Sequence, residues 1–165
     1  FPERGGARVK TKGVNEKCLL SNPELKEKPG FFAYQNLCSL WRPDYKANPV
    51  DYRIAVKDQG IFYGIGEEDD AFPSVPLLAT FKDENNNWLM AWWLPWNMQE
   101  YIPKFAKINI QASQIEMKDP VIIDLLTGDV FEPESVKSEK GEIMINNLPM
   151  ADYPLVLVER NTIKF

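Results

Sequence analysis

Four acidic side chains are the first candidates for chemistry in this sequence. Hydrolysis of a glycosidic bond needs one carboxyl group as an acid and a second as a base or nucleophile, held at a set separation. Glu100, Glu116, Asp119 and Asp124 could supply such a pair, but their linear spacing gives no sign that two of them converge. A small hydrolase built on paired carboxylates is therefore an alternative, and the sequence singles out no catalytic residue.

Metal binding is a second possible chemistry. The run Glu67 to Asp70 is rich in carboxylate oxygens, but its four acids are consecutive, whereas a calcium loop spaces its ligands so that they converge. A solvated acidic loop is the better interpretation. The chain has no histidine, which excludes Ser-His and Cys-His nucleophiles and histidine-ligated zinc. We expect no metal and no cofactor.

Cys18 and Cys38 are the only cysteines. Two are too few for a zinc cage or a disulfide scaffold. They could form one bridge in an oxidising compartment, where it would contribute about 3 kcal/mol for a loop of this size. Two separate buried thiols are an equally good interpretation.

Aromatic side chains are the remaining candidates for a binding site. Flat tryptophan and tyrosine rings with polar edges can stack on the apolar faces of sugar rings when they lie on an exposed platform. Trp93, Trp96 and Tyr101 lie where an apolar stretch runs out into a proline-containing loop. We regard these three as candidate carbohydrate-binding residues, with burial in a core or interface as the alternative.

The element that must position these aromatics is the stretch 88–96, which holds four of the five tryptophans. With a period of two residues, Trp88, Met90, Trp92, Leu94 and Trp96 share one face of a strand. The intervening residues on the other face are also apolar. A strand with one face in water alternates apolar and polar residues, so this pattern predicts a central strand covered on both sides.

One convincing helix precedes the strands. Residues 1–30 carry several glycine and proline breaks and are expected to be extended. The segment 31–42 then places apolar side chains at helical spacing, and Pro43 prevents its continuation. Tyr34, Leu37 and Trp41 share one side of this helix. We expect the helix to pack on the following domain and these three residues to lie at a domain interface.

From residue 48 the pattern changes to period two and stays there to the C-terminus. The segments predicted as strands are 50–57, 61–65, 77–82, 88–94, 105–111, 120–126, 130–131, 142–146 and 155–159. Turn signals separate them at the spacing of a sandwich, including a tight turn in which Gly128 can supply positive φ. The sequence predicts an all-β fold, an antiparallel β-sandwich of about eight strands over 48–165, preceded by one short α-helix.

Composition limits the partners. The formal net charge is −5, which argues against a nucleic-acid-binding protein with its usual basic face. Residues 1–30 carry seven Lys and Arg against four Asp and Glu, so this segment has a net positive charge and the rest of the chain has a net negative one. No segment approaches the roughly 20 apolar residues of a membrane span, so we expect no membrane insertion.

The order of these motifs resembles a known architecture. The segment 28–41 is similar to the K-P-x-Y-x-A-x-Q-N-L pattern with which many TIM-barrel glycoside hydrolases enter their last barrel helix. Before it, 3–8 and 17–20 resemble a glycine-rich stretch and a G-L-L motif of those enzymes. After it, the W-L-P-W ending at 93–96, the D-P-V-x-I-D-L-L-T-G-x-V pattern at 119–130 and the Y-P-L-V-L strand at 153–157 resemble their C-terminal β-sandwich.

The resemblance spans nearly the whole chain and implies an accessory role. A TIM barrel needs about 250 residues and carries its catalytic carboxylates at the ends of its strands. These 165 residues have no room for one beside the sandwich, so no catalytic residue carries over. The resemblance implies a non-catalytic accessory domain that packs on a catalytic barrel, in a secreted or periplasmic protein. A free-standing carbohydrate-binding module, with polysaccharide as its partner, is the alternative.

Overall fold

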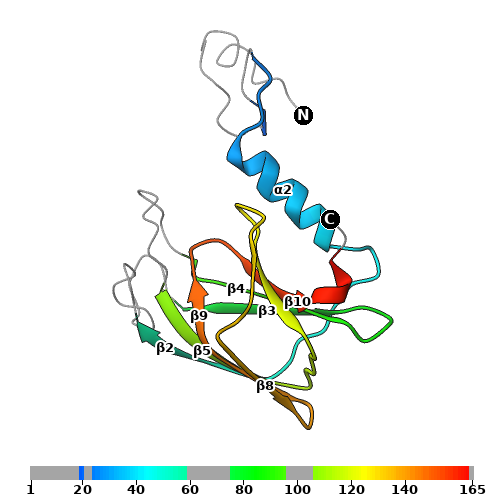
Figure 1. Ribbon diagram of the computed structural model, residues 1–165, viewed down its shortest axis with the longest axis vertical. Helices are drawn as coiled ribbons and strands as arrows, with labels where there is room; N and C mark the ends of the chain where they lie inside the picture. The colour runs from blue at the N-terminus through cyan, green and yellow to red at the C-terminus, as the bar shows by residue number, and fades with distance from the viewer. Residues whose placement is uncertain (1–18, 21–23, 59–74, 96–105, 164–165) are drawn as a thin grey trace, which may run out of the picture.

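The computed structural model describes residues 19–20, 24–58, 75–95 and 106–163, and it forms a β-sandwich with one helix (Figure 1). The elements, in chain order, are α2 (Pro29–Leu40), β1 (Lys46–Ala47), β2 (Tyr52–Asp58), β3 (Leu77–Lys82), β4 (Trp88–Trp93), β5 (Ala106–Ser113), β6 (Pro120–Asp124), β7 (Val130–Phe131), β8 (Ser135–Glu139), β9 (Glu142–Met150), β10 (Leu155–Glu159) and the 3₁₀ turn η1 (Arg160–Thr162). The predicted all-β sandwich preceded by one short helix is confirmed.

Two antiparallel sheets make up the sandwich. The larger has the order β1-β3-β4-β10-β6-β7, and the smaller has the order β2-β5-β9-β8. The predicted hairpin is present, since β3 pairs with β4 from Lys82 opposite Trp88 to Leu77 opposite Trp93. The C-terminal strand β10 lies between β4 and β6 and pairs with both. The last strand of the chain therefore completes the centre of the larger sheet.

Two strands were not predicted from the sequence. β8 carries a single apolar residue, Val136, among serines, a lysine and a glutamate, so it lacks the alternation by which strands are recognised. It forms because β9 offers it a full ladder, from Ser135 opposite Asn146 to Glu139 opposite Glu142. β1 is only two residues long and pairs with the edge of β3. The predicted strand at 61–65 lies outside the described residues.

Strand β4 is buried on both faces, as its sequence predicts. Trp88, Met90 and Trp92 face the smaller sheet and belong to the core between the sheets. Leu89 and Ala91 face the opposite way, into a second apolar cluster on the outer side of the larger sheet. Met90 and Trp92 are both fully inaccessible to solvent. The chain therefore has to supply a covering layer on each side of this sheet.

Alternate residues of the strands fill the core between the sheets, and most of these residues are β-branched or otherwise apolar. Its fully buried large members include Ile108, Ile110, Ile143, Ile145 and Leu148 from the smaller sheet. One polar contact crosses it. The indole Nε1 of Trp92 donates a hydrogen bond to the backbone oxygen of Pro149 at 2.7 Å. Because the Trp92 ring is fully buried and its N–H needs an acceptor, this bond ties the larger sheet to β9 of the smaller one.

The helix begins at Pro29, two residues before the predicted start at 31, and ends at Leu40, two residues before the predicted end at 42. Proline suits the first helical position because it has no N–H to leave unpaired. Cys38 is exposed on α2 as a free thiol, so it is neither bridged nor buried. Within the part of the chain that the structure describes, no helix is long and apolar enough to span a bilayer.

The hydrogen bond between the sheets can be tested by substitution. We expect Trp92→Phe to lower the free energy of unfolding by about 2 kcal/mol, because it removes the hydrogen-bond donor of the Pro149 oxygen and leaves a void. Trp93→Phe is the matched control, since it removes the same atoms from the half-buried opposite face of β4. Urea unfolding measures both. Equal losses in the two variants would contradict the assigned role of the bond.

Candidate functional site

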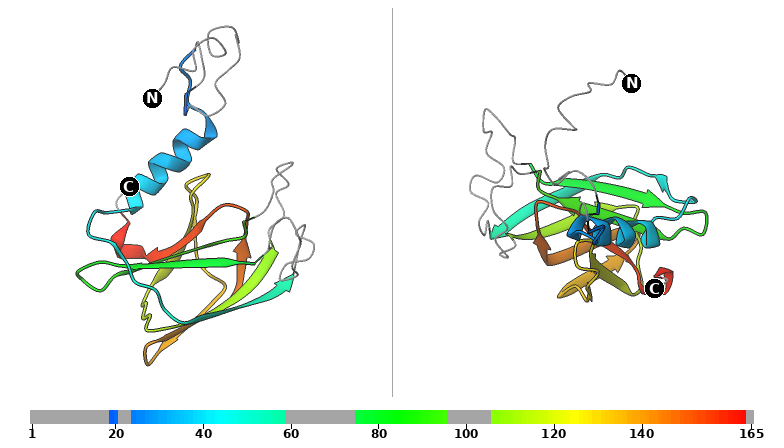
Figure 2. Two further views of the ribbon diagram at one scale, coloured as in Figure 1. Left: turned by 180° about the vertical axis from the view of Figure 1, so that it is seen from behind. Right: turned by 90° about the horizontal axis from the view of Figure 1, so that it is seen from above.

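The outer face of the larger sheet is the most distinctive surface of the molecule. Its second apolar cluster brings together Leu89 and Ala91 of β4 with Val156 and Val158 of β10. Leu40, the one buried residue of α2, lies in the same cluster. Figures 1 and 2 show α2 rising from this side of the sandwich, with its C-terminal end against the sheet and its N-terminal end directed away.

A side-chain hydrogen bond determines how α2 is rotated on the sheet. The amide Nδ2 of Asn36 donates to the backbone oxygen of Leu125 at 3.0 Å, across 89 residues of sequence. Leu125 opens the connection between β6 and β7. Gly128, in the same connection, has φ of +81°, and a Cβ placed there would lie 3.2 Å from Asn36 Nδ2. Glycine therefore permits both the turn and the close approach of the helix.

The turn that receives Asn36 is held by a buried carboxylate. Asp124 accepts hydrogen bonds from the backbone N–H of Leu126 at 2.8 Å and of Thr127 at 3.2 Å through Oδ1. Its Oδ2 accepts from the Tyr153 hydroxyl at 2.8 Å. The Asp-Leu-Leu-Thr-Gly sequence thus builds a rigid platform for the helix, rather than a site for a substrate.

Two further contacts fix the end of α2. The rings of Trp41 and Phe81 meet edge to face, with centroids 4.2 Å apart. Arg42 forms a salt bridge with the buried side chain of Asp83 at the β3–β4 hairpin. Asp83 also accepts N–H groups from Asn85 and Asn87. The end of the helix is therefore tied to two separate loops of the larger sheet.

An apolar groove of about 200 Å³ lies between the end of α2 and the sheet. Only apolar and aromatic residues line it, among them Leu37, Trp41, Phe81, Ala91, Trp93 and Pro154. The groove is continuous with the second apolar cluster, because Leu37, Trp41 and Trp93 pack on that cluster's edge. The sheet is thus only partly covered on this side by the described residues.

Two aromatic side chains on different flanks of α2 are exposed, since residues two apart in a helix lie about 200° apart around its axis. Phe32 is 47% exposed and Tyr34 is 58% exposed. Cys38 follows Tyr34 by one helical turn, and a hydrogen bond to Cys38 together with its charge raises the pKa of the Tyr34 phenol above 10.0. Both rings therefore present apolar surface to solvent in the described part of the chain.

The candidate interface residues separate into two groups. Leu37 and Trp41 pack on the second apolar cluster, whereas Tyr34 is exposed. Of the candidate carbohydrate-binding residues, Trp93 is half-buried and lines the apolar groove. Trp96 and Tyr101 lie outside the described residues. Asn36 was missed in the sequence, because it is one of three polar side chains of the helix, with Gln35 and Ser39, and no local pattern distinguishes it.

The candidate carboxylates have structural partners. Glu116 accepts the Gly141 N–H at 2.8 Å, and Asp119 pairs with Arg160 at 2.8 Å. Asp124 is the buried turn residue described above. Glu100 and the acidic run 67–70 lie outside the described residues. Within the described ranges, no three His, Cys, Asp or Glu side chains come together in a way that could hold a metal ion.

A comparison with models of known protein families finds no match for this chain.

Gly128 provides a test of the helix attachment. We expect Gly128→Ala to destabilise the fold by about 2 kcal/mol or more, because alanine is strained at positive φ and also presses on Asn36. Gly141→Ala is the control, since Gly141 has φ of +77° but open space around its Cβ position. It should carry only the backbone cost, about 1 kcal/mol. The two unfolding free energies measured in urea give the difference, and equal values would refute the close contact.

Asp83 provides a test in acid. Burial raises the pKa of its carboxyl, but hydrogen bonds from Asn87 and Asn85 and the charge of Arg42 outweigh this, so the pKa lies below its ordinary value of 3.8. A lowered folded-state pKa stabilises the protein above the unfolded pKa, and this contribution is lost as the pH falls through the folded pKa. Asp83→Asn should cost about 2–3 kcal/mol at pH 7 and flatten the fall in stability below pH of about 4.

Asp51→Asn is the control for Asp83, because the Asp51 side chain bonds to no described residue and only its backbone oxygen accepts hydrogen bonds. Thermal unfolding between pH 2.5 and 7 compares the two. An unchanged pH profile in the Asp83 variant would exclude a charged Asp83 as part of the fold.

Proposed function

We propose that this chain is a non-catalytic β-sandwich accessory domain of a glycoside hydrolase, which packs on a catalytic barrel and stabilises it. The contact surface would be the exposed side of α2 together with the apolar groove beside Trp93. Catalysis would belong to the barrel, and the domain would act in a secreted or periplasmic protein.

The observation that carries the proposal is the mismatch between the composition of α2 and its burial. The N-terminal half of the helix carries three aromatic side chains, Phe31, Phe32 and Tyr34, a composition typical of helices enclosed by protein. Yet Leu40 is the only one of its 12 residues that is buried among the described residues. A helix this short is marginal in water on its own. A second surface against Phe32 and Tyr34 would remove the mismatch.

The way the sandwich holds the helix supports the same role. The Asn36 hydrogen bond and the edge-to-face pair of Trp41 with Phe81 fix the rotation of α2, so Phe32 and Tyr34 are presented in a defined direction. A defined direction is what a domain interface requires. The resemblance of segment 28–41 to the entry of a last barrel helix supports a barrel as the partner that these residues meet.

The alternatives rest on weaker ground. An aromatic platform for polysaccharide would need exposed rings, and the described member, Trp93, faces an apolar groove next to α2. That module stays a prediction for Trp96 and Tyr101. A carboxylate hydrolase would need two acids directed at one substrate, whereas Glu116 and Asp119 are engaged in the contacts that hold their loops.

The first test of the proposal is the coding sequence upstream of Phe1. A barrel encoded there, in frame or in a neighbouring gene, is the expected result. If neither the frame nor its neighbours encode a barrel, the proposal fails.

The second test uses that full protein. We expect the double variant Phe32→Ser with Tyr34→Ser to lower the melting temperature of the barrel by about 5 °C or more, because it replaces apolar contact area with hydroxyls. Met144→Ser is the control. Met144 is 39% exposed, but on the outer face of the smaller sheet, away from α2. Differential scanning calorimetry resolves the barrel transition, and equal shifts in both variants would contradict the proposal.

A further inference from the structure

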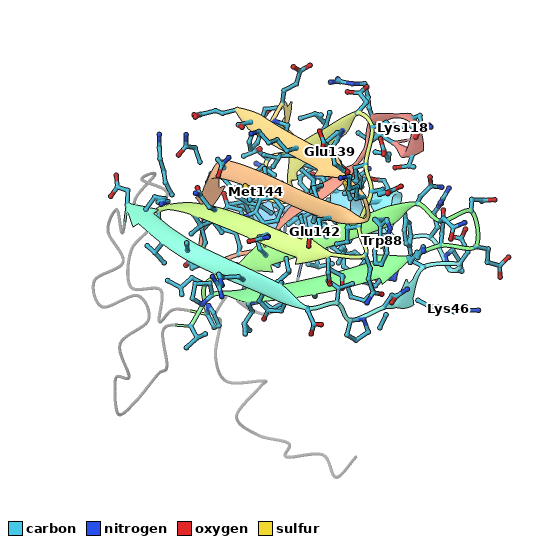
Figure 3. The ribbon with its side chains drawn as sticks, turned by 90° about the horizontal axis from the view of Figure 1, so that it is seen from below. Lys46, Trp88, Lys118, Glu139, Glu142 and Met144 are labelled. Carbon is cyan, nitrogen blue, oxygen red and sulfur yellow. The ribbon has the colours of Figure 1, made fainter. Side chains whose placement is uncertain are left out.

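A polar cleft of about 940 Å³ lies at one end of the sandwich. Four segments that are distant in sequence converge on it: the β3–β4 hairpin, the β5–β6 connection, the β8–β9 turn and the end of β10 with η1. Figure 3 shows Trp88, Lys118, Glu139 and Glu142 near this end of the molecule, with Met144 farther along β9. The cleft shares no lining residue with the apolar groove beside α2.

The walls of the cleft are held in place by bonds between different segments. Glu116, in the β5–β6 connection, accepts the Gly141 N–H of the β8–β9 turn at 2.8 Å. Glu159, at the end of β10, accepts the N–H groups of Lys118 at 2.5 Å and Asp119 at 2.9 Å. Each carboxylate therefore joins one wall to the next, and the cleft exists before any ligand arrives.

The backbone around the cleft is equally defined. Asn86, Gln114 and Lys140 line it with φ of 65°, 62° and 54°, in the left-handed region that non-glycine residues rarely occupy. A residue in the left-handed region reverses the chain sharply, so each of these residues lies in a tight turn at the rim of the cleft. The three turns present their side chains around one opening.

Four carboxamide side chains line the cleft without a bond to any described residue. They are Asn85, Asn86, Gln114 and Asn161. A carboxamide offers two N–H donors and one oxygen acceptor from the same group. A sugar hydroxyl likewise donates and accepts, so neighbouring hydroxyls of one ring pair well with such amides. Carbonyl-only or ammonium-only ligands would leave half of these groups unpaired.

The charges around the cleft nearly cancel. Its cationic side chains are Lys82, Lys118 and Lys140, and its anionic ones are Glu116, Asp119, Glu139 and Glu159, which gives 3 − 4 = −1. The Lys82 ammonium lies 4.8 Å from the Trp88 ring centre, so part of this charge is already paired with an aromatic face. A balanced set exerts little net attraction on an anion or a cation, and it favours a neutral polar ligand.

We propose that this cleft binds a neutral segment of an oligosaccharide. The preformed opening, the four unpaired carboxamides and the near-zero local charge all match an uncharged, hydroxyl-rich chain. The site goes beyond the docking of a barrel, because it uses different residues and would work in the isolated sandwich or in a larger enzyme.

The test is a titration of the chain with four hexasaccharides, observed by ¹H–¹⁵N NMR. The neutral probes are cellohexaose, xylohexaose and mannohexaose, and the charged probe is hexagalacturonate. We expect at least one neutral probe to shift the backbone signals of Asn85, Asn86, Gln114 and Asn161. The double variant Asn85→Ala with Asn161→Ala should weaken that binding by about tenfold or more, because two hydrogen-bonding groups are lost.

The control variant is Gln111→Ala, which removes an exposed carboxamide from β5 on the outer face of the smaller sheet and should leave the affinity unchanged. Three results would overturn the proposal: no neutral probe binds, the double variant binds as the unmodified chain does, or hexagalacturonate binds more tightly than every neutral probe. None of these results bears on the melting temperature of a barrel, so the two proposals fail separately.

Discussion

The double burial of β4 is the constraint on which the rest of the structure depends. An interior strand buried on both faces needs a covering layer on each side as well as a partner strand along each edge. β3 and β10 supply the edges, and the smaller sheet supplies one layer. The second layer is made by the end of α2, by Tyr45 in the chain that follows it and by Ile163 after η1, which meet in the outer apolar cluster. That second layer is the incomplete one, and the groove beside Trp93 is where it stops.

Much of this sandwich could be predicted because its strands follow the period of two that half-buried or buried strands require. The bounds of β3 and β10 agree with the predicted segments, and Gly128 has the positive φ expected from its turn. β8 could not be predicted, since its backbone pairing with β9 carries it and its side chains contribute little. The position of β10 between β4 and β6 was also out of reach, because local pattern gives strands but not their order.

The candidate surface shows a different limit. Helical spacing places Tyr34, Leu37 and Trp41 on one side of α2, and Leu37 and Trp41 pack on the outer cluster. Tyr34 is exposed, because the N-terminal part of the helix rises away from the sheet (Figure 1). The rotation is decided by one hydrogen bond, from Asn36 to Leu125, between segments 89 residues apart. Such a bond depends on a helix and a turn, distant in sequence, meeting in space. The sequence pattern does not identify this hydrogen bond, and only the folded structure does.

The combination of apolar contacts with one specific hydrogen bond bears on the role of α2. If apolar contact alone held the helix, a modest rotation would cost little, because apolar residues flank those that face the sheet. The Asn36 bond makes such a rotation expensive, because the Leu125 oxygen would lose its partner in a part-buried position. Gly128 gives Asn36 the room to come so close. The fold therefore uses a specific polar contact to fix which residues of α2 face the sheet, and hence the directions in which Phe32 and Tyr34 are exposed. A fixed orientation of α2 is what the proposed contact with a second domain would require.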